Sequence, residues 1–169
     1  NASTLAKNQD IEVVDDPVDV INAGSAIFIL SMGIYADKDK PATVQILKDG
    51  QLSTIGNATM MAYDAYNDQL YMINAPFGGD KEYKVYNLKN GQTTTFLTNP
   101  DIFSPYSLAV NPVNGDVFIT SSTKNPDTGY ADYPADCKLY RYTSAGILLG
   151  TYDCGVNPGT IVCDSYYQK

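Results

Sequence analysis

Aromatic and acidic side chains gather in the longest stretches of the sequence that carry no strand pattern. A tyrosine combines a broad apolar surface with a hydroxyl that forms hydrogen bonds, which suits contact with sugars, peptides and other large polar ligands. An alternative is that these rings pack against their own loops. The candidate ligand contacts are Tyr35, Phe77, Phe103, Tyr106, Tyr130, Asp132 and Tyr133.

The residue types argue against an enzyme. The 169 residues include no histidine, so histidine-dependent triads and the usual general base near neutral pH are excluded. Paired aspartates can act as acid and base, but no such pair here sits in a recognisable motif. The glycine-rich stretch at residues 78–81 lacks the phosphate-loop pattern. We therefore predict no catalytic residues and no cofactor.

Metal binding is not expected either. The acidic stretches at residues 37–39 and 127–132 lack the full spacing of a calcium loop. The three cysteines, Cys137, Cys154 and Cys163, form no paired motif of the zinc-binding type. Two interpretations of them stay open: buried thiols in strands, or a disulfide between Cys137 and Cys154 across one hairpin.

The charge balance restricts the partners. With 11 basic and 19 acidic residues the formal net charge is −8, which repels nucleic-acid backbones and anionic lipid surfaces. The longest clear apolar run, at residues 26–30, is far too short to cross a bilayer. We expect no nucleic-acid partner and no membrane insertion of this segment.

The elements that must position these side chains follow an internal repeat. A short apolar strand ends in Asn or Asp, a tight turn and a second apolar strand follow, and a hairpin completes the unit. The repeat recurs at roughly 40 to 50 residues, which is the length of a four-stranded propeller blade. The strand-ending residues are Asn22, Asp64, Asn111 and Asp164.

The predicted fold is all-β: a β-propeller fragment of three four-stranded blades plus the inner strand of a further blade. The blades cover residues 17–56, 57–100 and 101–155. Residues 1–16 form a lead-in with an outer strand of a preceding blade at 11–14, and 156–169 hold an inner strand of the closing blade at 160–164. A β-sandwich is the alternative.

The blade count does not close a ring, because propellers normally have four to eight blades. We therefore predict either a piece of a larger propeller or self-association of two copies through the open edges. Within each blade the long connections, at residues 32–42, 75–82 and 122–136, should lie on one face together with the connection 99–105. Loops on a rigid scaffold usually carry function, and residues 122–136 are the strongest candidate recognition element.

Residues 104–120 resemble the blade motif of YVTN/NHL-like and YncE-like propellers. Residues 155–162 resemble the closing blade of seven-bladed surface lipoproteins of gut Bacteroidetes, a group largely of unknown function. The resemblance implies the C-terminal half of such a protein, located outside the cytoplasm at the cell surface or in the periplasm. This sequence lacks a lipobox cysteine near Asn1. Some members of the group bind cobalamin, which adds corrinoids to the ligand classes.

The functional expectation is a non-enzymatic, extracytoplasmic binding module that acts through the face of long loops. Its ligand would be a glycan, a peptide or a corrinoid, held by aromatic and acidic side chains. The alternative is a structural or protein-interaction scaffold at the cell surface that binds a surface protein and no small molecule. Aromatic loops serve either role.

Overall fold

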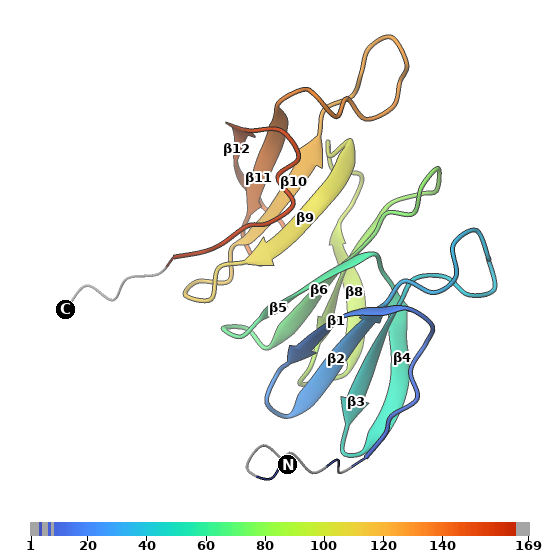
Figure 1. Ribbon diagram of the computed structural model, residues 1–169. Helices are drawn as coiled ribbons and strands as arrows, with labels where there is room; N and C mark the ends of the chain where they lie inside the picture. Colours follow the sequence, from blue (N-terminus) through green and yellow to red (C-terminus); the bar gives the residue numbers. More distant parts are fainter. Residues whose placement is uncertain (1–3, 5–6, 8, 165–169) are drawn as a thin grey trace.

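Twelve strands form three four-stranded antiparallel sheets in the computed structural model, which describes residues 4, 7 and 9–164 (Figure 1). The first sheet contains β1 (Pro17–Asn22), β2 (Ala26–Ser31), β3 (Thr43–Lys48) and β4 (Gln51–Asn57). The second contains β5 (Met60–Asp64), β6 (Gln69–Asn74), β7 (Glu82–Asn87) and β8 (Gln92–Leu97). The third contains β9 (Ser104–Val110), β10 (Val117–Ser122), β11 (Cys137–Tyr142) and β12 (Leu148–Cys154). Each sheet is therefore one blade, as predicted.

Each sheet is a meander in which strands adjacent in sequence are hydrogen-bonded neighbours. The β3–β4 hairpin turns through Asp49 and Gly50, whose φ angles are 51° and 74°. Two positive φ angles give the turn a twist that matches the flanking strands, which explains why the Asp-Gly pair signals this hairpin.

The residue that marks each repeat has the same role in all three blades. The side-chain oxygens of Asn22, Asp64 and Asn111 each accept a hydrogen bond of 2.9 Å from the backbone amide two residues later. An Asn or Asp side chain that bonds in this way closes the turn after the first strand. The repeat marker is thus a turn residue, and this explains its recurrence without any role in binding.

The core lies in two layers between the sheets. Phe28, Leu70 and Met72 belong to the cluster between the first and second sheets. Tyr71 and Ile119 belong to the cluster between the second and third sheets. Strand β6 is buried on both faces because its alternate residues enter opposite clusters. Three sheets packed in series form a row of blades, whereas a sandwich has only two.

The two additional strands expected from the sequence, at residues 11–14 and 160–164, do not form. A strand needs a neighbouring ladder, and neither segment pairs with one; the lead-in and the C-terminal segment are instead joined to a sheet by hydrogen bonds outside any ladder. The Val14 amide donates to Gln45 Oε1 at 2.9 Å, and Thr120 Oγ1 donates to the Pro158 carbonyl at 2.9 Å. The C-terminal segment, red in Figure 1, crosses the third sheet. The assignment of both segments to further blades stays a prediction.

The long connections project from one side of the molecule, and the short turns lie on the other (Figure 1). The long connections are residues 32–42, 75–81 and 123–136, and together they make the long-loop face. No helix among the described residues is long and apolar enough to cross a membrane.

Candidate functional site

The rings at the tips of the three long loops are exposed. Tyr35 in the first loop is 90% exposed and Phe77 in the second is 87% exposed, so neither packs against its own loop. Tyr130 and Tyr133 in the third loop are exposed as well. No ring contact joins these side chains within the described part of the chain. They are spread along the face, and their role in binding stays a prediction.

The third loop has its own internal hydrogen bonds. Asn125 accepts bonds from the amides of Asp127 and Thr128 at 2.9 and 3.0 Å, and its own amide donates to the Tyr130 carbonyl. The Asp132 amide donates to the Thr123 carbonyl at 2.8 Å, and the Asp132 side chain is half-buried. These bonds hold Tyr130 at the tip of an ordered loop.

Phe103 lies between two lysines from different loops. The Lys81 ammonium is 5.7 Å from the ring centroid, and the Lys124 ammonium is 5.9 Å from it. Both distances are within the range of cation–π attraction. Connections of the second and third blades therefore meet at one aromatic ring, which comes from the link between those blades.

A cleft of about 380 Å³ opens beside Lys81. We call it the junction cleft. Tyr83 and Ile102 are its buried residues. It is lined by Gly79, Asp80, Lys81, Tyr83, Asn99, Pro100 and Ile102.

Tyr83 lines the junction cleft, and its buried hydroxyl is an unused hydrogen-bond donor. Its side chain is only 3% exposed, and its hydroxyl has no hydrogen-bond partner among the described residues. Burial raises the pKa of Tyr83 well above its usual value, and nearby Tyr142 and Tyr140 add to the effect. The hydroxyl therefore stays protonated and available as a donor. A buried polar group without a partner is rare in proteins and calls for an explanation.

Two lysines lie at the site in a protein whose net charge is negative. Lys81 and Lys124 form no ion pair in the described part of the chain, whereas Lys40 is paired with Asp15 at 2.9 Å. An unpaired ammonium beside a cleft attracts an anionic group. Asp80 lines the same cleft and limits how much negative charge it accepts.

A second cavity of about 500 Å³ lies where the lead-in meets the first sheet. Its lining includes Glu12, Asp15 and Lys40. The only lysine in that lining is already neutralised by Asp15, so the larger cavity offers less to a ligand than the junction cleft does.

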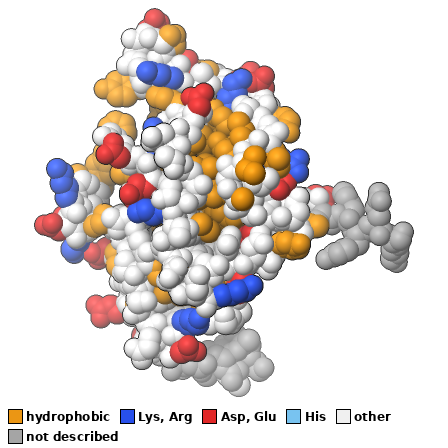
Figure 2. All heavy atoms as spheres, turned by 180° about the vertical axis from the view of Figure 1, so that it is seen from behind, with side chains coloured by type: hydrophobic (Ala, Val, Ile, Leu, Met, Phe, Trp, Pro, Cys, Tyr) orange, Lys and Arg blue, Asp and Glu red, His pale blue; other side chains and the backbone are white. Residues whose placement is uncertain are grey.

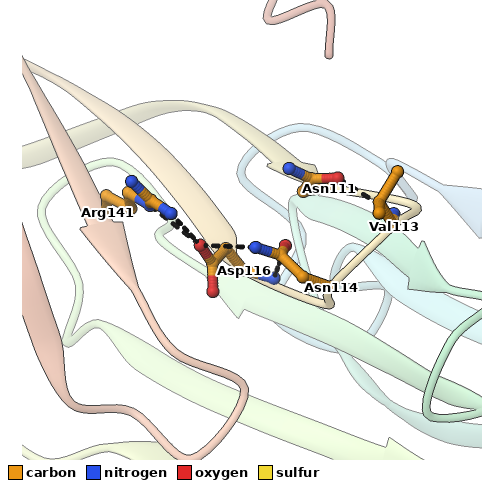
Figure 3. Close-up of polar contacts among 5 residues, drawn as sticks. All are labelled: Asn111, Val113, Asn114, Asp116 and Arg141. Carbon is orange, nitrogen blue, oxygen red and sulfur yellow. Dashed lines mark hydrogen bonds and ion pairs between the residues drawn. The ribbon is translucent and has the colours of Figure 1, made fainter. Parts of the chain in front are cut away.

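Side chains at the opposite end of the third blade satisfy one another (Figure 3). Asp116 is buried and accepts bonds from Arg141 Nε at 2.8 Å and from Asn114 Nδ2 at 3.1 Å. Asn111 accepts the bond from the Val113 amide. Because Arg141 compensates the charge of Asp116, we assign this network to the stability of the β9–β10 turn and not to ligand binding.

The structure places the predicted contact residues in different surroundings. Phe103 lies in the connection between β8 and β9, with Lys81 of the junction cleft against its ring, and its role in binding stays a prediction. Tyr106, also predicted as a loop-face contact, lies inside β9, and its ring is against Gly159 of the C-terminal segment. The sequence analysis missed Tyr83 because its position in a strand pattern marks it only as a core residue. It also missed Lys81 and Lys124, because no sequence motif surrounds either lysine.

The sequence matches no known family model and no curated protein. Solved structures with the same arrangement do exist. The β-propeller domain of the Trilobed protease from Pyrococcus furiosus matches with a TM-score of 0.61 and 14% identity, over 84% of this chain and 43% of that one. A gluconolactonase from Xanthomonas campestris, XC5397, matches with a TM-score of 0.55 and 20% identity, over 87% of this chain and 49% of that one. TolB from Acinetobacter baumannii matches with a TM-score of 0.52 and 14% identity, over 85% of this chain and 34% of that one.

These likenesses establish the fold, because the identities are too low to carry an activity across. The chain has the β-propeller fold and supplies three of its blades. It spans less than half the length of each of the three solved chains.

Proposed function

We propose that the chain is a non-enzymatic ligand-binding module of a propeller, acting through the long-loop face. The unpartnered hydroxyl of Tyr83, a residue that lines the junction cleft, carries the proposal. A buried donor without a partner costs about 1 to 3 kcal/mol, and a ligand oxygen that accepts its bond would recover that cost.

The surrounding side chains define the ligand chemistry that fits best. Tyr83 needs an acceptor, Lys81 and Lys124 favour a negative charge, and the Phe103 ring offers an apolar contact. A sugar bearing a carboxylate provides all three, since its ring has an apolar face and its hydroxyls accept hydrogen bonds. Among glycans, peptides and corrinoids, an acidic glycan is therefore our first choice.

We also propose that the chain acts outside the cytoplasm, at the cell surface or in the periplasm, as part of a YncE-like propeller lipoprotein. The motif at residues 104–120 supports this group, and the propeller fold is consistent with it. Fractionation of the native host, followed by detection of the protein with an antibody, tests the location. Recovery in the cytoplasmic fraction would contradict it.

A protein-interaction scaffold is the second candidate. Tyr35, Phe77 and Tyr130 are exposed on three separate loops, and no ring contact joins them within the described residues, which suits a broad protein partner better than one small molecule. Exposed aromatic residues are enriched at such interfaces.

Calorimetric titration with an oligogalacturonate and with a neutral glycan of equal length tests the first proposal. We expect the acidic glycan alone to bind, and its binding to weaken as salt rises. Tyr83→Phe removes only the donor and should weaken binding about tenfold. Tyr66→Phe, at an exposed turn of the opposite face, is the matched control and should leave affinity unchanged.

The outcomes separate the candidates. If a peptide or a corrinoid binds instead, and Tyr83→Phe weakens that binding, the junction cleft is the binding site but the ligand is not an acidic glycan. No binding by any of the three classes would reject the site. Capture of a purified surface protein that is lost in Tyr35→Ala and Phe77→Ala but retained in Tyr83→Phe would support the scaffold.

A further inference from the structure

Two cysteines face each other across the last hairpin. Cys137 is the first residue of β11 and Cys154 is the last residue of β12, and the register pairs them directly. Residues directly opposite in an antiparallel pair have Cα atoms about 4.5 to 5.5 Å apart, with side chains on the same face. A disulfide requires a Cα separation of about 4.4 to 6.8 Å. The ladder therefore already holds both residues at bridging distance.

The surroundings of the two thiols agree with a close pair. Cys137 is 1% exposed, and its Sγ lies 3.8 Å from the Ala135 carbonyl oxygen. Cys154 is half-buried, and burial together with the neighbouring Cys137 raises its pKa. All three cysteines are thiols in this structure, and Cys163 lies in the C-terminal segment outside the hairpin.

We propose that Cys137 and Cys154 are the site of a cross-strand disulfide, and that Cys163 remains a thiol. The oxidant is a small-molecule or protein disulfide. The more exposed Cys154 thiolate attacks one of its sulfurs and releases one thiol. The Cys137 thiolate then attacks Cys154 Sγ and releases the second thiol, so two protons and two electrons leave the protein pair.

The bond would fix the base of the third long loop. That loop ends at Asp136, whose carbonyl accepts the Thr123 hydroxyl, and Cys137 follows immediately. Strand β12 is an edge strand that pairs only with β11, and most of its residues are exposed. A covalent link at Cys154 would stop this edge from fraying at the end nearest the loop. The inference does not depend on which ligand the long-loop face binds.

Thiol counting tests the proposal directly. The reduced, folded protein is equilibrated with oxidised and reduced glutathione, quenched with acid, denatured and titrated for free thiols. We expect three thiols before oxidation and one after it, a mass lower by two hydrogens, and a peptide map that joins Cys137 to Cys154. The disulfide should raise the melting temperature by about 5 to 10 °C.

Single substitutions supply the controls. Cys163→Ser should still form the bond and end with no free thiol, whereas Cys154→Ser should keep both of its thiols and gain no thermal stability on oxidation. Three persistent thiols in the folded protein, a bond to Cys163, or a mixed glutathione disulfide that never resolves would each overturn the proposal. Because Cys154 is only half-buried, Cys154→Ser should fold even if changes at Cys137 do not.

Discussion

Individual tyrosines account for much of the chemistry of this chain, because their hydroxyls are placed in very different surroundings. Tyr63 donates to Asp68 at 2.6 Å, and Tyr71 donates to the Ser144 carbonyl at 3.1 Å. Tyr83 is buried to a similar degree as Tyr71 and has no such partner. The same residue type thus supports the fold at two positions and leaves a donor unused at the third.

Tyr83→Phe should make the ligand-free protein more stable, by about 1 kcal/mol, because it removes a buried polar group that has no partner. Urea unfolding at neutral pH measures the change. Tyr71→Phe is the matched control, and it should lower stability because its hydroxyl is bonded. A loss of stability in Tyr83→Phe would mean that the hydroxyl is satisfied in solution.

The tyrosines also predict an alkaline limit. Burial holds the pKa of Tyr83 above the ordinary value of 10.0, and burial followed by the Asp68 bond raises the pKa of Tyr63 to about 12. A raised folded-state pKa means that the folded protein keeps its proton more tightly. The contribution of each such tyrosine to the stability of the fold is complete below pH 10. It is lost as the pH rises from there through the pKa of that tyrosine in the folded protein.

The free energy of unfolding should therefore fall between pH 10 and pH 12. Urea titrations at closely spaced pH values measure the slope. Tyr83→Phe should show a shallower fall than the native chain, because one of the raised groups is gone. Equal slopes in both proteins would contradict the assignment to Tyr83.

At the scale of elements, the loops depend on backbone positions where no side chain fits. Gly33 is the second residue of the first long loop and has a φ of +69°, and a Cβ added there would lie 2.1 Å from the Lys40 carbonyl oxygen. Gly24 has a similar φ of +79° in the β1–β2 turn, but a Cβ there would meet nothing within 4 Å. A side chain at Gly24 would therefore meet backbone strain alone, whereas a side chain at Gly33 would meet the same strain and a steric clash.

Gly33→Ala should destabilise the protein by clearly more than Gly24→Ala, which should cost about 1 kcal/mol from strain alone. Thermal unfolding of the two variants measures the difference. Hydrogen exchange should show the added loss of protection in residues 32–42. If both substitutions cost the same, the close approach of Gly33 to Lys40 is not maintained in solution.

At the scale of the whole molecule, the row of blades leaves apolar side chains uncovered. Val20 is 61% exposed on the face of the first sheet that has no neighbouring sheet, and Tyr152 of β12, which the register pairs with Leu139, is exposed on the third sheet. Figure 2 shows hydrophobic side chains gathered over the part of the molecule that holds the third sheet. Contiguous exposed apolar surface marks an interaction site.

We expect two copies to associate through these outer faces, as closed propellers pair each blade with two others. Light scattering on a size-exclusion column should give twice the mass of one chain. Val20→Asp should shift the protein to monomer, while Val113→Asp, exposed in the β9–β10 turn, should not. A monomer at high concentration would contradict self-association.

The local structures of this chain, which are its strands and hairpin turns, follow from the sequence alone. Alternating apolar residues and turn residues such as Asp49-Gly50 specify strands and hairpins, because those signals act between near neighbours. They predicted the three four-stranded sheets and the position of the long loops. They did not anticipate that residues 11–14 and 160–164 stay irregular, because a strand also requires a partner from elsewhere in space.

Tertiary structure decided the candidate site. Lys81, Phe103 and Lys124 come from three separate connections, and only the packing of the second blade against the third brings them together. The strand pattern places Tyr83 in β7 but cannot say that its hydroxyl lacks a partner, since that depends on every atom around it. Local interactions thus fix where chains turn and extend, and long-range packing fixes which side chains meet.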